Sequence, residues 1–168
     1  MSIQTLLDFI GKYESRGDYG VVWGGVKSED RPKNLTEMSI NEVLKWQRFI
    51  TAKKRYKSSA AGKYQVIRKT LMSVYTSAGF SVDDAFNAAC QDRIAISLLE
   101  RRGLLHYQEG TIKTETFANN IAREWASMPV VSGVNAGKSY YARDGVNKAH
   151  ASVDDFLAAV RASKNYST

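Results

Sequence analysis

An apolar stripe with helical spacing opens the chain and leads directly into a glutamate. Its members follow one another at steps of three and four: Ile3, Leu6, Leu7, Ile10 and Tyr13. This spacing is typical of the buried face of an amphipathic helix. Glu14 continues the stripe, and the turn-forming sequence 15–20 follows it at once. We therefore expect a helix over residues 1–13 that carries a carboxylate in its last turn, on the face turned to the core.

A carboxylate in that position is expected to hold its proton more tightly than usual. Loss of water disfavours the anion, and the negative end of the helix dipole opposes it as well. Glu14 would then have a raised pKa, as a general acid working near neutral pH requires. The alternative is a glutamate that lies exposed at a fraying helix end or pairs with Arg16.

Length and composition fit one globular domain over residues 1–168. The apolar fraction is 43% and the charged fraction 24%, both ordinary for such a domain. No apolar run is long enough to span a membrane, so we expect no stable membrane insertion. The N-terminus lacks the features of a secretory signal peptide. Cys90 is the one cysteine, which excludes an intrachain disulfide and suits a small core residue.

Periodicity and turn residues predict a mainly helical α+β fold with about six helices and one small β-hairpin. After the first helix we expect a short strand or hairpin at 19–26, a helix capped by Ser39 and Glu42, and a loop at 52–62. A helix at 65–77 should end at Gly79, and a long helix should run from the Ser81–Asp84 cap to Gly103 with Ala85 and Ala89 on its apolar face. A helix from Thr114 that ends by Pro129, a loop at 130–147 and a last helix capped by Ser152 should follow.

The remaining chemistry points to carboxylates and aromatic rings. His106 and His150 belong to no metal-spaced cluster, and no phosphate-binding loop is present. The net charge of +7 favours an anionic partner, although the basic run 53–57 is more typical of a solvated face. Tyrosines and tryptophans near predicted helix ends suit sugar faces. Together with Glu14, they favour glycoside cleavage.

Three short motifs occur in the order seen in a known superfamily. They are Glu14-Ser15, Gly62-Lys63-Tyr64-Gln65 and Trp125-Ala126-Ser127-Met128-Pro129. With Val21 to Gly25 as an extension, the chain resembles the lysozyme-like superfamily from Ile10 to about Pro129. It is most similar to the lambda-type phage endolysins, which are lytic transglycosylases acting on peptidoglycan. The turn at 17–20 is much shorter than in that group.

The resemblance implies a role for five residues and no cofactor or metal. Glu14 matches the catalytic acid, Tyr64 and Gln65 match residues lining the sugar cleft, and Trp125 and Ser127 match the wall of the groove. The implied reaction cleaves the bond between N-acetylmuramic acid and N-acetylglucosamine. The 6-hydroxyl of the sugar would attack its own anomeric carbon, which leaves a 1,6-anhydro end and needs a single enzymic carboxyl group.

Other functions stay open at this stage. A hydrolytic muramidase would need a second carboxylate about 5 to 5.5 Å from the first to retain configuration, or about 6.5 to 9.5 Å to invert it. Asp18, Glu29, Asp30 and Glu37 are available for this. A non-catalytic basic module that binds cell wall or nucleic acid, or an inactive virion component, would explain the charge but not Glu14.

The favoured interpretation also fixes the expected partner and location. We expect a monomer that acts on murein glycan strands and not on nucleic acid. Without an export signal, such an enzyme would reach the periplasmic wall from the host cytoplasm at lysis, or be carried in the virion. Its positive charge would favour accumulation at anionic murein, and salt would weaken that attraction.

Overall fold

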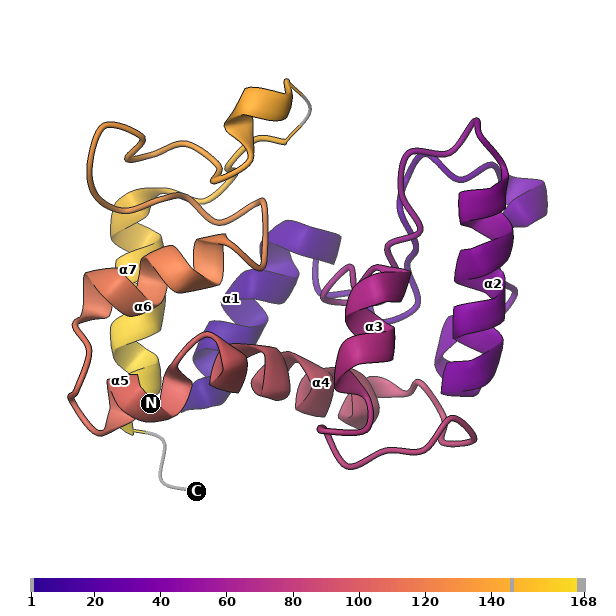
Figure 1. Cartoon of the computed structure of the whole chain (residues 1–168), viewed down its shortest axis with the longest axis horizontal. Coiled ribbons are helices and arrows are strands. Elements are labelled where there is room, and N and C mark those ends of the chain that lie inside the picture. Colours follow the sequence, from indigo (N-terminus) through magenta and orange to yellow (C-terminus); the bar gives the residue numbers. More distant parts are fainter. Residues whose placement is uncertain (1, 146, 166–168) are drawn as a thin grey trace. The chain divides into compact units, whose positions relative to one another are not determined.

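The structure, a computed structural model, describes residues 2–145 and 147–165 and is mainly helical, as predicted. The α-helices, seen in Figure 1, are α1 (Ile3–Ser15), α2 (Ile40–Ala52), α3 (Arg68–Val74), α4 (Ala88–Arg101), α5 (Leu104–Gln108), α6 (Thr114–Ala122) and α7 (Val153–Ala162). Short 3-10 helices are η1 (Ser28–Asp30), η2 (Leu35–Glu37), η3 (Ala142–Asp144) and η4 (Ser163–Asn165). None of the helices in the described part of the chain is long and apolar enough to cross a bilayer.

The chain forms two compact units. Unit 1 comprises Met1–Glu14 and Leu98–Thr168, and unit 2 comprises Ser15–Ser97. One boundary therefore falls directly after Glu14, in the last turn of α1, and the other falls within α4. The expectation of a single domain over residues 1–168 stays a prediction.

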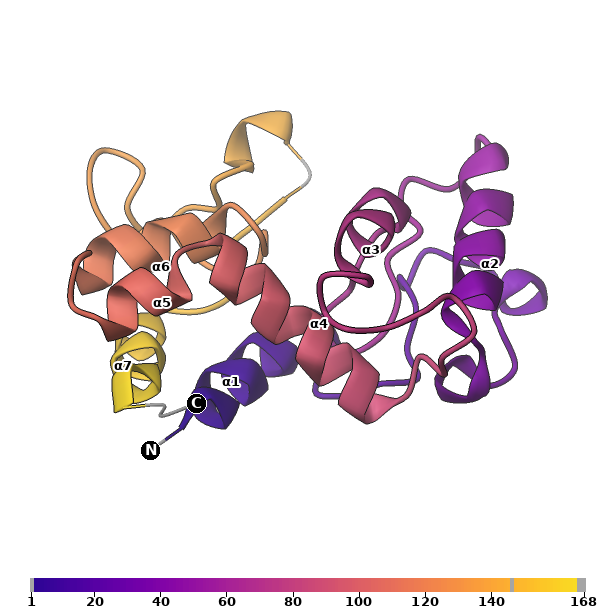
Figure 2. The same ribbon diagram turned by 60° about the horizontal axis from the view of Figure 1, so that its bottom comes forward.

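The core of unit 1 is built from the apolar faces of α1, α6 and α7. Ile3, Leu6, Leu7 and Ile10 of α1 are all buried, as the stripe predicted. Phe9 stacks on Phe156 of α7, with ring centroids 6.1 Å apart. Helices α6 and α7 pack against each other, as Figures 1 and 2 show.

A second aromatic pair joins α5 to α6. Tyr107 and Phe117 stack with centroids 4.9 Å apart, and both side chains are buried. The helix α5 was not predicted. Gly103, expected to end the long helix, does so with a left-handed φ of 101°, and α5 begins at the next residue.

Unit 2 starts its main helix with the predicted cap. The backbone N–H of Glu42 donates to Ser39 Oγ at 3.2 Å, and the Glu42 carboxylate accepts from the N–H of Ser39 at 2.7 Å. This is a capping box. Helix α2 packs against α3, and its buried Gln47 donates to the carbonyls of Ser59 and Val66 at 3.0 and 2.8 Å. Gln47 thus ties the predicted loop to α2.

The predicted strand or hairpin at 19–26 is not formed as such. Residues 19–26 contain one bridge position, Val22, which pairs with Ala61, and Ala61 also pairs with Val66. These are isolated antiparallel bridges. The segment whose Tyr, Val and Trp residues suggested a strand is instead irregular, and backbone hydrogen bonds hold it to the segment around Gly62.

Three helices are shorter than predicted. The helix expected from Thr114 to Pro129 ends at Ala122, so Trp125 lies beyond it in a turn. The helix expected at 65–77 is limited to Arg68–Val74, because Gln65 has a φ of +47°, which an α-helix does not allow. The helical spacing of Ile67 with Leu71 and Val74 predicts that Ile67 faces inward, but its relative exposure is 45%. Gly79 follows with a φ of +91° and ends the helical turns, as predicted.

The long helix begins later than its apparent cap. Ser81 and Asp84 do exchange hydrogen bonds, since the N–H of Ser81 donates to the Asp84 carboxylate at 2.7 Å, but these bonds close a turn. Helix α4 starts at Ala88, where Asn87 Oδ1 accepts from the N–H of Cys90 at 3.0 Å. Ala85 and Ala89 are exposed, against the predicted apolar face. The later cap at Ser152 was predicted and is confirmed, with Asp155 N–H donating to its hydroxyl at 3.1 Å.

Candidate active site

Glu14 lies in the last turn of α1 and meets a serine that is far away in the sequence. The Ser127 hydroxyl donates a hydrogen bond to Glu14 Oε1, and the backbone N–H of Ser127 donates to the same carboxylate. Both residues belong to unit 1. Ser127 is buried, with a relative exposure of 6%, and Glu14 is partly buried, so the contact is partly shielded from water.

Two opposing influences set the proton affinity of Glu14. Burial raises its pKa above the ordinary value for a glutamate, and the hydroxyl and N–H of Ser127 act in the opposite direction because they stabilise the anion. Burial is the larger influence, which confirms the predicted direction. The two alternatives, a glutamate exposed at a fraying helix end or one paired with Arg16, are wrong, because Glu14 is partly buried and its hydrogen-bond partner is Ser127.

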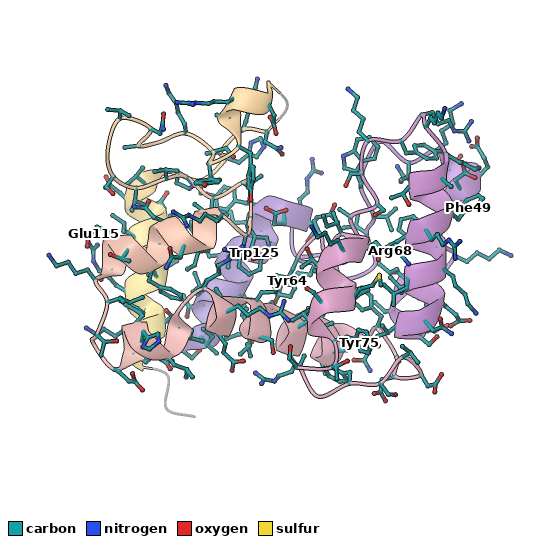
Figure 3. All side chains as sticks on the ribbon, in the orientation of Figure 1. Phe49, Tyr64, Arg68, Tyr75, Glu115 and Trp125 are labelled. Atoms are coloured by element: carbon teal, nitrogen blue, oxygen red, sulfur yellow. The ribbon has the colours of Figure 1, made fainter. Side chains whose placement is uncertain are left out.

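Ser127 is held by a turn that begins at the end of α6. Trp125 donates its N–H to the Ile121 carbonyl at 3.1 Å, and Met128 donates to the Trp125 carbonyl at 3.0 Å. The carbonyl of Ser127 accepts from the N–H of His150 at 2.9 Å. Trp125, labelled in Figure 3, has a relative exposure of only 3%. The buried indole of Trp125 therefore supports this turn from the protein interior.

Tyr64 and Gln65, the predicted cleft residues, belong to unit 2. They follow Gly62, whose φ is +79° and whose missing side chain leaves room for Gln91. A Cβ on Gly62 would lie 2.2 Å from Gln91 Oε1. Gln65 is partly buried and donates through Nε2 to the Gly62 carbonyl at 3.0 Å. The Gly-x-Tyr-Gln motif is therefore a tight turn that fastens itself.

Tyr64, also labelled in Figure 3, belongs to a partly buried polar network. Its hydroxyl donates to Asp92 Oδ1 at 2.5 Å, and the Tyr19 hydroxyl donates to the same carboxylate at 2.9 and 3.0 Å. Lys63 Nζ donates to the Tyr19 hydroxyl at 3.1 Å, although Lys63 is only 4% exposed. Sequence reasoning missed Asp92, because nothing in its local pattern separates it from an ordinary polar position of α4.

Among the residues considered for a second carboxylate, Asp30 has a clear structural role. Lys53 Nζ lies 2.5 Å from it, Arg55 Nη2 lies 2.6 Å away, and the Tyr56 hydroxyl donates to it at 2.5 Å. Lys53, with Tyr56 and Arg55, holds the pKa of Asp30 well below its usual range. Two cations of the basic run 53–57, Lys53 and Arg55, thus neutralise one buried carboxylate.

The other three considered carboxylates are exposed. Asp18 accepts from the N–H of Gly20 at 2.7 Å, which closes the turn after α1. Glu29 lies 3.9 Å from Arg55, and Glu37 is exposed in η2. Their environments are those of ordinary surface groups, so they offer no match to the burial of Glu14.

The side chains of Cys90 and His106 lie in settings unlike that of Glu14, and His150 contacts the site through its backbone. Burial raises the pKa of the Cys90 thiol to about 11, which fits the predicted inert core position. His106 is exposed and lies 3.7 Å from Glu109, while His150 contributes its backbone N–H to Ser127. In the described ranges, no group of three or more His, Cys, Asp or Glu side chains is arranged to hold a metal ion.

Unit 1 therefore presents a partly buried carboxyl group that accepts hydrogen bonds from a serine, in a mainly helical chain. The sequence matches a family model described as Endolysin over residues 14–153. That range begins at Glu14 and includes every predicted site residue. The chain belongs to the endolysin family, a family of phage cell-wall lytic proteins, and is a peptidoglycan-degrading enzyme. Neither the curated proteins nor the solved structures compared with the chain match it.

Proposed function

We propose that this endolysin is a lytic transglycosylase with a lysozyme-like catalytic domain. It would cleave the β-1,4 bond between N-acetylmuramic acid and N-acetylglucosamine and leave 1,6-anhydro-muramyl ends. The observation that carries the proposal is the environment of Glu14, a partly buried carboxyl group whose pKa is raised by burial and which accepts hydrogen bonds from Ser127. Such a group can keep a proton near neutral pH and release it to a substrate oxygen.

In the first step, the Glu14 carboxyl group donates its proton to the bridging oxygen. The bond between that oxygen and the anomeric carbon breaks, and positive charge develops on the muramyl ring. Glu14 is now an anion. The hydroxyl and N–H of Ser127 are directed at this carboxylate and stabilise it at the moment when it forms.

In the second step, the Glu14 carboxylate takes the proton of the 6-hydroxyl group on the same sugar. The freed oxygen attacks the anomeric carbon and closes the anhydro ring. Glu14 is protonated again, no water is consumed and no second carboxylate is required. Because the nucleophile belongs to the substrate, its proximity replaces a second catalytic group.

Tyr64 and Gln65 of unit 2, and Trp125 and Ser127 of unit 1, are each proposed to contribute to binding of the glycan strand. The burial of the Tyr64 and Trp125 side chains favours a supporting role for these two over direct stacking on a sugar. Gln65, which is only partly buried, is the better candidate for direct contact. The proposed substrate is the murein glycan strand, and the enzyme would act as a monomer without cofactor, metal, nucleic acid or membrane insertion.

The test is a substitution of Glu14 by Gln, assayed on purified murein. Gln keeps the shape and loses the proton, so strand cleavage should fall by about 100-fold to 10,000-fold. Glu115→Gln is the matched control, since Glu115 is an exposed glutamate of unit 1 in the first turn of α6. It should keep full activity. If Glu14→Gln clears cell walls as fast as the control, Glu14 is not the acid.

Mass analysis of the soluble products separates the reaction types. Anhydro-muramyl ends support the transglycosylase, whereas reducing ends formed with uptake of water would establish a hydrolytic muramidase. Access to the wall is proposed to come from the host cytoplasm at lysis or from delivery in a phage particle. Incubating intact cells with and without a membrane-permeabilising agent tests whether the added enzyme needs such help.

A further inference from the structure

The turn that presents Ser127 to Glu14 is fastened by an ion pair next to it. Arg102 follows α4, and Glu124 directly precedes Trp125. Arg102 Nε and Nη2 lie 2.8 and 2.7 Å from Glu124 Oε2, and the Glu124 side chain is only 13% exposed. An arginine that holds one oxygen with two donors fixes both distance and direction.

A further hydrogen bond strengthens the same attachment. The Asn120 side chain donates to the carbonyl of Arg102 at 3.1 Å, so Arg102 binds the end of α6 through its backbone and its side chain. Glu124 in turn donates its N–H to the Ile121 carbonyl at 2.8 Å. The segment Ile121–Met128 is therefore anchored before Trp125, and the N–H of His150 anchors it again at Ser127.

We propose that Arg102 and Glu124 are positioning residues, which hold the segment Ile121–Met128 so that the Ser127 hydroxyl meets the Glu14 carboxylate. Neither side chain needs to touch the substrate. The assignment deepens the proposed function and rests on it for its catalytic meaning. The contacts that support the assignment lie within unit 1, which contains Glu14, Arg102, Glu124 and Ser127.

Glu124→Gln is a test in which positioning and through-space electrostatics predict opposite shifts in the pKa of Glu14. Removing a negative charge from unit 1 would, through space, make Glu14 easier to ionise and lower its pKa. Loosening the ion pair would instead draw the Ser127 hydroxyl away from the carboxylate, and the pKa of Glu14 would rise. The measurement is the titration of the Glu14 side chain by carbon NMR in the full chain without substrate.

We expect the pKa of Glu14 to rise in Glu124→Gln by less than in Ser127→Ala. On the Ser127→Ala background, Glu124→Gln should cause a smaller rise, because the hydroxyl is already gone and only the backbone N–H of residue 127 is left to be displaced. Glu109→Gln is the matched control, since Glu109 is an exposed carboxylate of unit 1 that lies 3.7 Å from His106. It removes the same charge and should leave Glu14 unchanged or slightly easier to ionise.

Arg102→Lys gives an independent variant if Glu124→Gln does not fold. Lysine keeps the charge but lacks the planar pair of donors, so a smaller rise in the same direction is expected. An unchanged or lowered pKa of Glu14 in the folded variants, or equal rises with and without Ser127, would overturn the proposal. Because the titration uses no substrate, this result is separate from failure of the catalytic role of Glu14, which the murein assay detects.

Discussion

Substituting Ser127 by Ala should change the pH range over which the enzyme works. Alanine removes only the hydroxyl group. The backbone N–H that also donates to Glu14 is kept, and so is the Ser127 carbonyl that accepts from the N–H of His150 at 2.9 Å. The variant therefore isolates one hydrogen bond to the acid without dismantling the turn that presents it.

The size of the effect follows from what that hydrogen bond stabilises. A hydrogen bond to a charged group contributes about 1.5 to 3 kcal/mol. Its loss disfavours the Glu14 anion, and about 1.4 kcal/mol corresponds to one pH unit. The acid must be protonated at the start of the reaction, so activity falls as pH rises through its pKa. In Ser127→Ala, this alkaline limb of kcat/KM should move upward by about one to two pH units.

The assay is the initial rate of murein solubilisation at low substrate concentration, measured from pH 4 to pH 10 at constant ionic strength. At its own optimum the variant should also be slower, because the anion formed in the first step has lost a donor. Ser132→Ala is a matched control, since the Ser132 hydroxyl accepts a hydrogen bond from Asn119 at 2.9 Å and belongs to a different hydrogen-bonded pair from that of Glu14. An alkaline limb that stays in place, or moves to lower pH, would refute the assigned role of Ser127.

Three further predictions concern stability and reactivity. Glu14→Gln should be more stable than the unmodified chain at neutral pH. Because the pKa of Glu14 is raised in the folded state, ionisation of Glu14 lowers the free energy of unfolding as pH rises from the ordinary glutamate pKa through the folded-state pKa. Urea unfolding should therefore show a difference in the free energy of unfolding that vanishes in acid, and a pH-independent difference would contradict this. In Gly62→Ala the free energy of unfolding should fall by roughly 2 kcal/mol or more in the same assay, because the new Cβ would lie 2.2 Å from Gln91 Oε1 at a φ of +79°. The fall should be smaller in Gly17→Ala, where φ is +83° but the space around the Cβ is open. Cys90, whose pKa is raised to about 11, should react with a thiol reagent at pH 8 only after unfolding, and prompt labelling of the folded chain would show that it is accessible.

The elements that sequence periodicity predicted best are those whose signals are local. The stripe of α1 and the caps at Ser39 and Ser152 are each encoded within a few residues, and the structure confirms them. The Ser81–Asp84 pair carries the same local signal, yet it closes a turn instead of a helix. Ser39 and Ala85 form a bridge next to that turn. A tertiary contact there overrides what the local sequence favours.

The backbone of the Gly-x-Tyr-Gln motif shows a second limit. A left-handed residue is expected of glycine, and Gly62 fulfils that expectation. Gln65 is left-handed too, with a φ of +47°, and its side chain compensates by donating to the Gly62 carbonyl. Apolar spacing alone extended the helix α3 back through this position. Only the hydrogen bonds of the folded turn explain why the helix begins at Arg68.

The candidate site divides in the same way between local and distant information. The sequence places Glu14 on a buried face, because the stripe before it is unbroken over thirteen residues and a turn follows at once. It contains no signal that Asp92 would accept from Tyr64 and Tyr19, or that Arg102 would hold Glu124 beside the serine turn. These contacts join residues that only the completed fold brings together. In the proposed mechanism, a carboxyl group shielded from water and without a donor would stay protonated over a wide pH range, and the hydrogen bonds from Ser127 would make its anion accessible during the reaction. The balance between burial and Ser127 would then determine whether Glu14 can both give and recover a proton, and Arg102 and Glu124 are proposed to maintain this balance.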